Sequence, residues 1–266
     1  MSKIGKLKEI LKRMGRVVVA FSGGVDSSFL LKAAKDALPK KDILAVTAVS
    51  ETYTDSELRQ AKRFTKELGI KHKIIVTNEL KDRNFTKNPV NRCYYCKKEL
   101  FKKLAGIARR QEFNYVLDAS NKDDARDYRP GSRAKEEYGV RSPLMEAGFS
   151  KDDIRRHSMR LKLRTAEMPS MACLASRFPY GEGINKAALR KVGAAETFIK
   201  RQGISQARVR CHNNIARIEV EKQDIKRFVD KKFCDRITKR LKQLGFKYIA
   251  LDLEGYRTGS LNEVLK

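Results

Sequence analysis

The sequence lacks any long apolar run. No stretch of about 18 apolar residues occurs along its 266 residues, so it predicts no membrane-spanning helix. Residues 1–11 have the pattern of an amphipathic helix and contain no apolar core of the kind that a signal peptide needs. We therefore expect a cytoplasmic protein. With 41% hydrophobic and 34% charged residues, the composition is that of a globular chain with one large or two modest domains.

Acidic residues are scarce relative to basic ones. The 32 Asp and Glu against 59 Lys and Arg leave a formal net charge of +27, which favours anionic substrates or polyanionic partners such as RNA. However, the basic residues are spread along nearly every expected helix and form no block. A solvated basic surface explains the charge equally well. Charge alone therefore does not distinguish an RNA enzyme from a nucleotide enzyme.

Cysteines are few and odd in number, which argues against a disulfide framework. Cys93 and Cys96 stand three residues apart at the start of an expected helix, so they share a face and can share a metal. No second C-x-x-C exists to complete a four-cysteine zinc site. Cys173 lies in a loop of small residues that permits close approach by a ligand. Three such cysteines suit an iron–sulfur cluster with one open iron, or one reactive cysteine beside two incidental ones. Cys211 and Cys234 have no partner by spacing and are expected to be ordinary core or surface thiols.

The most distinctive stretch, residues 17–31, has the pattern of a strand, a glycine turn and a helix. The glycines let the backbone turn sharply and approach a ligand, and the helix N-terminus attracts phosphate. The missing Gly-Lys-Ser/Thr ending excludes a Walker loop. A glycine-rich turn without a ligand is the alternative. The residues expected to contact a nucleotide here are Ser22, Gly23, Gly24, Val25, Asp26 and Ser27.

Strand patterns alternate with helix patterns up to about residue 168. Further strands are expected at 43–49, 72–76 and 115–119, which predicts an α/β domain with a doubly wound parallel sheet. Ligands of such sheets bind at the carboxyl ends of the strands, where Thr47 and Asn121 stand. Polar residues that include Asp124 and Arg129 follow, and both are expected at the nucleotide site. The carboxylates among them suit Mg²⁺ or a ribose, or simply begin a polar helix.

The pattern changes near Met168-Pro169, so we expect two domains, 1–168 and 169–266. Ahead of the boundary, 141–144 is expected to be extended and Ser150 to cap a helix. Beyond it, a smaller α+β domain is indicated by helices at 186–202 and 224–244 and strands at 207–211, 216–220 and 248–253. Arg208 and Arg210 alternate on one strand, so both face the same way and can clamp a phosphate. Two solvated arginines on an exposed face are the alternative.

Several of these segments resemble known proteins. Ser-Gly-Gly-Val-Asp-Ser resembles the PP-loop of the ATP pyrophosphatases, which cleave ATP between the α- and β-phosphates and adenylate an acyl or amide-like oxygen. Across nearly the whole chain, the combination of motifs is similar to the LarE family. These motifs are Arg-Cys-Tyr-Tyr-Cys from Arg92, Asp-Tyr-Arg-Pro-Gly from Asp127, Arg-Ser-Pro-Leu from Arg141, Cys-Leu-Ala-Ser-Arg-Phe-Pro-Tyr-Gly from Cys173, Arg-Val-Arg from Arg208, Ala-Arg-Ile-Glu from Ala216 and Gly-Tyr-Arg from Gly255.

The resemblance implies an ATP- and Mg²⁺-dependent sulfur transferase in nickel-pincer nucleotide biosynthesis. Its members adenylate a carboxylate of pyridinium-3,5-dicarboxylate mononucleotide and convert it to a thiocarboxylate, and they form homo-oligomers. One variant gives up the sulfur of a single cysteine, which Cys173 matches. The other holds a [4Fe-4S] cluster on three cysteines, which Cys93, Cys96 and Cys173 match, so this chain resembles the cluster-bearing variant. In the family, the equivalents of Arg208 and Arg210 lie near the substrate phosphate.

Three other functions remain open. A tRNA thiolation enzyme also joins a PP-loop to cysteines and would use the charge, although no separate RNA-binding extension is visible. A glutamine-dependent amidating enzyme would need a glutaminase partner and gives the cysteines no role. A non-catalytic nucleotide-binding module would bind ATP without releasing pyrophosphate.

Overall fold

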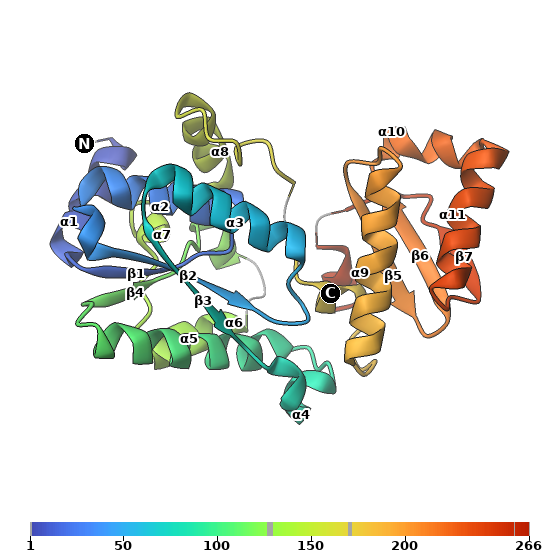
Figure 1. Ribbon diagram of the computed structural model, residues 1–266, viewed down its shortest axis with the longest axis horizontal. Coiled ribbons are helices and arrows are strands. Elements are labelled where there is room, and N and C mark those ends of the chain that lie inside the picture. The colour runs from blue at the N-terminus through green and yellow to red at the C-terminus, as the bar shows by residue number, and fades with distance from the viewer. Residues whose placement is uncertain (1, 127–129, 170–171, 258, 266) are drawn as a thin grey trace. The chain divides into compact units, whose positions relative to one another are not determined.

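The computed structural model describes residues 2–126, 130–169, 172–257 and 259–265 (Figure 1). The chain divides into two compact units. The first comprises Met1–Phe85 and Asn91–Met171, and the second comprises Thr86–Val90 and Ala172–Lys266. The division therefore falls a few residues after 168, and a short earlier segment joins the second unit.

Backbone hydrogen bonds explain why residues 86–90 group with the second unit. Ile184 N donates to Thr86 O at 2.8 Å, and Gly181 N donates to Asn88 O at 2.9 Å. The Asn88 side chain, which is fully buried, donates to Phe178 O at 3.3 Å and to Pro179 O at 2.6 Å. About ninety residues separate Asn88 from Phe178 and Pro179, and no pattern in the sequence indicates that they pair.

The first unit is built on a four-stranded parallel sheet in the order β3-β2-β1-β4. The central strand pairs on both sides, because Val18 is in register with Leu44 on one neighbour and with Val116 on the other. The parallel sheet expected from the sequence is confirmed. The strands are β1 (Val17–Ala20), β2 (Ile43–Val49), β3 (Lys71–Val76) and β4 (Tyr115–Leu117).

Helices cover both faces of this sheet, as the doubly wound pattern predicts (Figure 1). Successive residues of β1 point to opposite faces. Val17 and Val19 join the core that contains residues of α1, α2 and α3, whereas Val18 joins a second core with residues of α5 and α6. The helices are α1 (Lys3–Met14), α2 (Val25–Ala37), α3 (Asp55–Leu68), α4 (Arg83–Thr86), α5 (Arg92–Arg110), α6 (Gly131–Glu137), α7 (Pro143–Glu146) and α8 (Lys151–Arg160).

Local signals fix several helix ends. The Ser150 side chain accepts from Asp153 N while the Asp153 carboxylate accepts from Ser150 N, so the expected capping box of α8 is confirmed. Gly69 ends α3 in the left-handed conformation at φ 65°, in which glycine is the usual helix cap.

The second unit contains a three-stranded sheet in the order β5-β6-β7. Strands β5 (Ala207–His212) and β6 (Ile215–Val220) are antiparallel, and β7 (Tyr248–Leu251) is parallel to β6. The longest helices of this unit are α9 (Lys186–Arg201) and α11 (Lys231–Gln243). The expected α+β pattern beyond the boundary is therefore present.

Two expected elements differ from the structure. The single helix at 224–244 is wrong, because the chain forms α10 (Lys222–Ile225), a 3₁₀ turn (Lys226–Val229) and then α11. Asp230 causes the break: its backbone is extended and its side chain accepts from Phe233 N at 2.7 Å, which caps α11.

The extended segment at 141–144 is only partly correct. Arg141 forms a β-bridge with Leu117, but Pro143 begins α7, because its fixed φ angle suits the first turn of a helix. Within the described part of the chain, no helix combines the length and apolar character that crossing a membrane requires.

Candidate active site

The glycine loop lies between the end of β1 and the start of α2. Gly23 has a φ of +78°, and a Cβ on it would lie 3.4 Å from Ala61 of α3, so this position favours glycine. Gly24 is the N-cap of α2, and it has no side chain with which to cap that end. The hydroxyl oxygens of Ser22 and Ser27 are 3.1 Å apart, and Ser27 also donates to Gly24 O at 3.2 Å. The loop therefore presents a braced, positively polarised helix end that suits phosphate.

Asp26 follows one residue into the helix, after Val25. One of its carboxylate oxygens pairs with the Lys151 ammonium of α8. The other oxygen is buried and has no hydrogen-bond partner among the described residues. Lys151 N also donates to the Asp123 carboxylate at 2.7 Å. A buried carboxylate oxygen without a partner is costly, so this atom is suited to a cation or an N–H donor from a ligand.

Thr47 is fully buried, and its hydroxyl braces the loop from below. It donates to Phe21 O at 2.7 Å and lies 2.8 Å from Nε2 of His72. Burial, followed by the charge of Lys62, lowers the pKa of His72. The Thr47 hydroxyl therefore contacts the backbone at the start of the glycine loop. His72 stands at the start of an expected strand, but no pattern in the sequence links it to Thr47.

Two further side chains hold the loop, and the sequence analysis missed both. Tyr53 Oη donates to Ser22 O at 2.8 Å, and burial, followed by the charge of Glu57, raises the pKa of this phenol. Gln60 Nε2 donates to Gly23 O at 2.8 Å. Both contacts use loop carbonyls and do not involve the loop N–H groups. Neither residue belongs to a motif.

A second cluster of polar side chains in the first unit follows the end of β4. Asp118 accepts from the hydroxyls of Ser120 at 2.7 Å and Ser142 at 2.5 Å. Asn121 is 4% exposed, and its backbone N donates to the Asp124 carboxylate at 3.0 Å. Asn121 and Asp124 are therefore brought together. Arg129, also expected at the nucleotide site, lies outside the described residues.

Cys93 and Cys96 lie in the first turns of α5, as expected. Cys93 is exposed and Cys96 is half-buried. Cys96 Sγ donates to a carboxylate oxygen of Glu79 at 3.5 Å, and that oxygen also accepts from Ser50 at 3.2 Å. Glu79 is 6% exposed, and no sequence pattern places it there. Across the described ranges, no three His, Cys, Asp or Glu side chains gather as a metal-binding group.

Cys173 belongs to the second unit, where it is the exposed N-cap of a short 3₁₀ helix, Leu174–Arg177. Its sulfur accepts from Ala175 N at 3.4 Å. Arg177 Nη1 donates to Ala172 O at 2.9 Å and to Cys173 O at 3.1 Å. Arg177 thus holds the carbonyl groups of the two peptide bonds that flank the Cys173 Cα.

Arg177 is itself held by a buried ion pair with Glu196 of α9. Its Nε and Nη2 donate to the two Glu196 oxygens at 2.7 and 3.0 Å, and the two side chains are only 3% and 6% exposed. Burial raises the pKa of Glu196, but the charges of Arg177 and Arg208 outweigh it, so the net shift is downward. The pair is therefore ionised at neutral pH.

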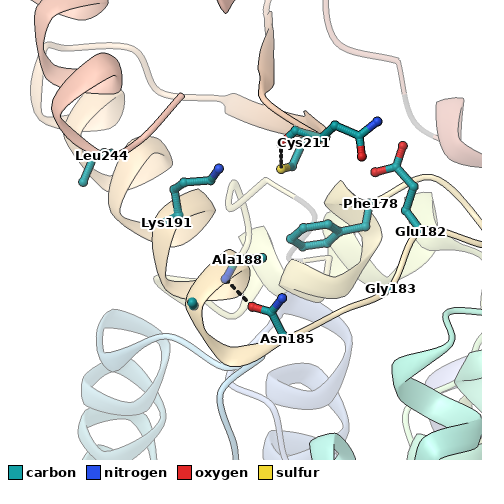
Figure 2. A pocket seen from close by; sticks show the side chains of 10 residues that line it. Phe178, Glu182, Gly183, Asn185, Ala188, Lys191, Cys211 and Leu244 are labelled. Carbon is teal, nitrogen blue, oxygen red and sulfur yellow. Dashed lines mark hydrogen bonds between the residues drawn. The ribbon is translucent and has the colours of Figure 1, made fainter. Parts of the chain in front are cut away.

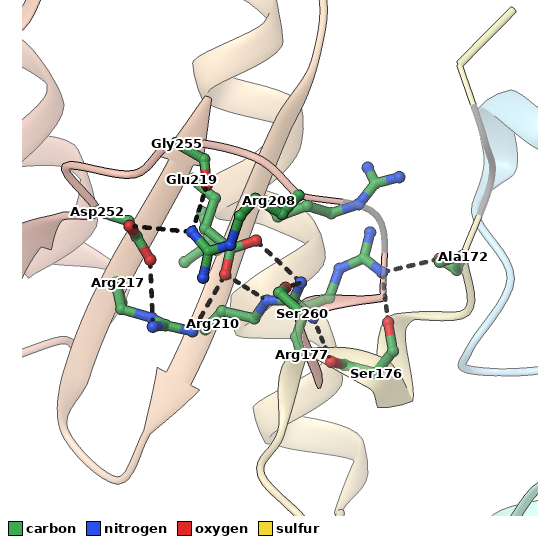
Figure 3. A network of polar contacts seen from close by, with 12 residues as sticks. Ala172, Ser176, Arg177, Arg208, Arg210, Arg217, Glu219, Asp252, Gly255 and Ser260 are labelled. Atoms are coloured by element: carbon green, nitrogen blue, oxygen red, sulfur yellow. Dashed lines mark hydrogen bonds and ion pairs between the residues drawn. The ribbon is translucent and has the colours of Figure 1, made fainter. Parts of the chain in front are cut away.

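Arg208 and Arg210 project from one face of β5 into a polar network (Figure 3). They are 3% and 7% exposed, so the alternative of two solvated arginines is wrong. Arg210 donates to both oxygens of Glu219 at 2.9 Å, to Ser176 O at 2.6 Å and to the Ser260 hydroxyl at 2.8 Å. The bidentate face of Arg210 is therefore taken by Glu219.

Arg208 lies differently in the same network. Its guanidinium is 5.5 Å from the centroid of the Tyr256 ring. Burial, followed by the nearby charge of Arg177, lowers its pKa. Several arginines thus crowd this face of the sheet, and Arg217 adds another by pairing with Glu219 and Asp252. The carboxylates of Glu196, Glu219 and Asp252 pair with arginines of this network, so positive and negative charges alternate in it.

Cys211 lies on the opposite face of β5 and is 4% exposed, as expected for a core thiol. It lines a cavity of about 490 Å³ together with residues that include Lys191 and Phe178 (Figure 2). Its Sγ donates to Asn213 O at 3.5 Å, and burial raises the pKa of the thiol. Cys211 therefore points away from the network around Arg210. Cys234 is half-buried.

Comparison with known proteins identifies the family. The family model of NAD synthase matches residues 5–103, which include the glycine loop. An uncharacterized protein of Synechocystis sp. is 43% identical over 99% of this chain and 98% of its own length. Pyridinium-3,5-bisthiocarboxylic acid mononucleotide synthase of Lactiplantibacillus plantarum is 39% identical over 99% of this chain and 95% of its own length. This chain belongs to the LarE family. An uncharacterized protein of Methanocaldococcus jannaschii is 30% identical over 97% of this LarE chain and 98% of its own length.

The two units of this LarE protein each contain part of the predicted site. The first unit brings together the glycine loop, the Asp26–Lys151 pair and Thr47, and it carries Cys93 and Cys96 on α5. The second unit links the Cys173 turn to Arg210 through Ser176, whose backbone oxygen accepts from that arginine. The family assignment makes both parts candidates for one reaction.

Proposed function

We propose that this protein is an ATP-dependent sulfur transferase. It activates a carboxylate of pyridinium-3,5-dicarboxylate mononucleotide as its adenylate, releases pyrophosphate and converts the carboxylate to a thiocarboxylate. One observation carries the proposal. The chain is 39% identical, over 99% of its length, to a relative named as the synthase of the bisthiocarboxylic acid mononucleotide. The braced glycine loop supports ATP as the activating substrate, because it offers a polarised helix end to a polyphosphate.

The first unit supplies the groups for adenylation. A carboxylate oxygen is a poor leaving group, and transfer of AMP to it creates a good one. Backbone N–H groups around Gly24 and the hydroxyls of Ser22 and Ser27 would hold the polyphosphate. The unpartnered oxygen of Asp26 fits Mg²⁺, which neutralises phosphate charge. Thr47, Asn121 and Asp124 would line the nucleotide site.

The sulfur would come through Cys173. As the exposed N-cap of a 3₁₀ turn, its sulfur accepts from Ala175 N and remains open to a substrate. In the sacrificial form of the reaction, the Cys173 thiolate attacks the adenylated carbon and AMP leaves, which gives a thioester. Loss of the Cα proton of Cys173 to a base then breaks the Cβ–S bond, so that the sulfur leaves with the product as its thiocarboxylate and dehydroalanine remains in the chain. The Arg177 contacts would keep the sulfur aimed while the bond forms.

The alternative route within this proposal uses a [4Fe-4S] cluster held by Cys93, Cys96 and Cys173. All three are thiols, the ligands that such clusters take, and Cys93 and Cys96 lie three residues apart near the start of α5. When bound, such a cluster supplies an iron with an open position that can carry sulfide. The ultimate sulfur donor is not identified by either route.

Arg208 and Arg210 would provide the positive field for the substrate phosphate. Both are buried among other arginines, where a phosphate would be less screened than in water. Because the Glu219 carboxylate already accepts from two N–H groups of Arg210, we infer a contribution through charge and the remaining N–H groups of this face.

We also expect a homo-oligomer that works in the cytoplasm.

The test is a single-turnover reaction with ATP, Mg²⁺ and the dicarboxylate mononucleotide. AMP and pyrophosphate should form together, and the product should carry one thiocarboxylate per turnover. The two routes are separated by measuring the iron and acid-labile sulfide content of protein purified without oxygen. The native chain is compared with the variants Cys93→Ala, Cys96→Ala and Cys173→Ala. About four irons per chain that each variant loses would support the cluster route.

Mass spectrometry after turnover completes this test. Conversion of Cys173 to dehydroalanine would support the sacrificial route, and protein with neither iron nor this modification after turnover would refute the sulfur-transfer proposal. Pyrophosphate release that depends on tRNA, with salt-sensitive tRNA binding, would instead favour tRNA thiolation.

A further inference from the structure

We propose that Tyr53 and Gln60 are positioning residues of the glycine loop, which turn the N–H groups of Gly23 and Gly24 toward the bound polyphosphate. The inference rests on the proposed binding of ATP at this loop, and it adds two residues that lie outside the Ser-Gly-Gly-Val-Asp-Ser motif. The contacts that carry it are made to the carbonyl side of the loop.

Four consecutive carbonyl oxygens of the loop each accept a hydrogen bond from a side chain. Because a carbonyl oxygen is an acceptor with a partial negative charge, one that faced a phosphate would repel it. All four are instead directed at donors of the protein. The donors are Thr47 to Phe21 O at 2.7 Å, Tyr53 to Ser22 O at 2.8 Å, Gln60 to Gly23 O at 2.8 Å and Ser27 to Gly24 O at 3.2 Å.

The same contacts fix the direction of the loop N–H groups. A trans peptide unit is planar, so its N–H points away from its C=O. Tyr53 holds the oxygen of the Ser22–Gly23 peptide and therefore directs Gly23 N–H to the opposite side. Gln60 holds the oxygen of the Gly23–Gly24 peptide and does the same for Gly24 N–H.

Hydroxyl groups lie on the side to which Gly24 N–H points. Gly24 N donates to Ser22 Oγ at 3.3 Å, and this oxygen lies 3.1 Å from Ser27 Oγ. The contact at 3.3 Å is long for a hydrogen bond from an N–H group. A phosphate oxygen, as a charged acceptor, would replace it with a shorter and stronger one.

The glycines make the two side-chain contacts important. Rotation of the peptide plane between Gly23 and Gly24 changes ψ of the first and φ of the second, and neither residue has a Cβ to oppose the rotation. A rotated plane would present Gly23 O to the phosphate in place of Gly24 N–H. The hydrogen bond from Gln60 selects the orientation that binds an anion. Donors oriented in advance need no reorganisation when the charged ligand arrives.

Both donors are anchored outside the loop. Tyr53 lies just before α3, and its backbone N donates to Ser50 O at 3.1 Å. Burial, followed by the charge of Glu57, raises the pKa of the Tyr53 phenol, so it stays a donor at neutral pH. Gln60 lies on α3, and its Nε2 also donates to the Met168 sulfur at 2.7 Å. Each side chain therefore reaches the loop from a separately held segment.

The amide signals of Gly23 and Gly24 test the proposal. The chain contains 16 glycines, so an NMR spectrum of the full chain labelled with ¹⁵N-glycine has few signals. Ser-Gly and Gly-Gly each occur once in the sequence, so carbonyl ¹³C-serine or ¹³C-glycine labelling assigns both amides. The probe is inorganic pyrophosphate with Mg²⁺. We expect it to shift both amide protons downfield, because charge-assisted hydrogen bonds form.

Tyr53→Phe and Gln60→Met keep the size of each side chain and remove its donor. Each variant should weaken pyrophosphate binding by about threefold to tenfold, the effect of one hydrogen bond. Tyr53→Phe should reduce the downfield shift at Gly23, and Gln60→Met should reduce it at Gly24. A role in folding alone would lower the urea midpoint without selecting one amide. Tyr248→Phe and Gln223→Met change exposed residues and should leave affinity and shifts unchanged.

Three results would overturn the inference. These are a native chain that binds no pyrophosphate, variants that bind it as tightly as the native chain, and binding that leaves both amides unshifted. If the variants bind as tightly as the native chain and thiocarboxylate still forms, the positioning role fails and the proposed function stands. If the variants lose affinity as expected but the native chain forms no thiocarboxylate, the sulfur transfer fails and the positioning role stands.

Discussion

Replacing Glu196 with glutamine should both destabilise the second unit and disturb Cys173. The Glu196 carboxylate accepts three N–H groups: two from Arg177, at 2.7 and 3.0 Å, and one from Val209 N at 3.0 Å. The glutamine has nearly the same shape but places an NH₂ group against the guanidinium. The buried Arg177 charge would then lack its counter-ion.

The expected loss in the free energy of unfolding is about 3 kcal/mol, the lower end for breaking a buried ion pair, since the introduced amide keeps one acceptor oxygen. Urea denaturation measures it. Glu254→Gln is the control, because Glu254 is 73% exposed in its pair with Arg257 and should cost less than about 0.5 kcal/mol. Equal midpoints for the two variants would refute the energetic reasoning.

The second consequence concerns the Cys173 turn. Arg177 fixes Ala172 O and Cys173 O, so loss of its anchor should loosen the turn that directs Ala175 N at the sulfur. Alkylation of Cys173 by iodoacetamide at neutral pH should slow, measured in a chain whose other cysteines are alanine. The double variant Arg177→Met with Glu196→Leu should recover part of the stability, because an apolar pair can replace an ion pair although Val209 N–H loses its acceptor. It should not recover the native alkylation rate, because neither new side chain can donate to the turn. Native reactivity in that double variant would contradict a positioning role for Arg177.

Three further predictions concern the first unit. The hydrogen bond from Lys3, followed by the one from Ser150 N–H, holds the pKa of Asp153 well below its usual range. The stability that this carboxylate contributes is therefore complete above about pH 4 and is lost as the pH falls through the pKa of the folded state. Asp153→Asn should accordingly flatten the acid side of a plot of the free energy of unfolding against pH. Ser27→Ala removes a buried hydroxyl that lies 3.1 Å from Ser22, and should lower pyrophosphate release by about tenfold while the free energy of unfolding falls by no more than about 1.5 kcal/mol; native turnover would argue against a phosphate contact. Phe29 is fully buried, 5.3 Å from the Phe149 ring, so Phe29→Ala should lower the free energy of unfolding by about 3–5 kcal/mol, and a loss under about 1 kcal/mol would contradict this packing.

The parallel sheet and the glycine loop could be predicted from the sequence without a structure. Both depend on neighbours along the chain: the apolar runs of β1 and β2, the glycines that permit the turn, and the capping residues Ser150 and Gly69. Such signals act over a few residues through backbone geometry and local hydrogen bonds. The full-length resemblance to LarE also needed only the order of the motifs.

The pairing of the polar groups, in contrast, became visible only in three dimensions. Arg210 and Glu219 lie diagonally across a hairpin, and the Glu219 carboxylate accepts the two N–H groups of Arg210 that the sequence analysis assigned to a phosphate. Thr47 braces the loop, and Asp230 divides an expected helix. Glu79 reaches Cys96, and Glu196 reaches Arg177, from other elements of the fold. These pairings depend on which elements come together in space, and burial then favours a partner for every charge, a requirement that no local pattern in the sequence records.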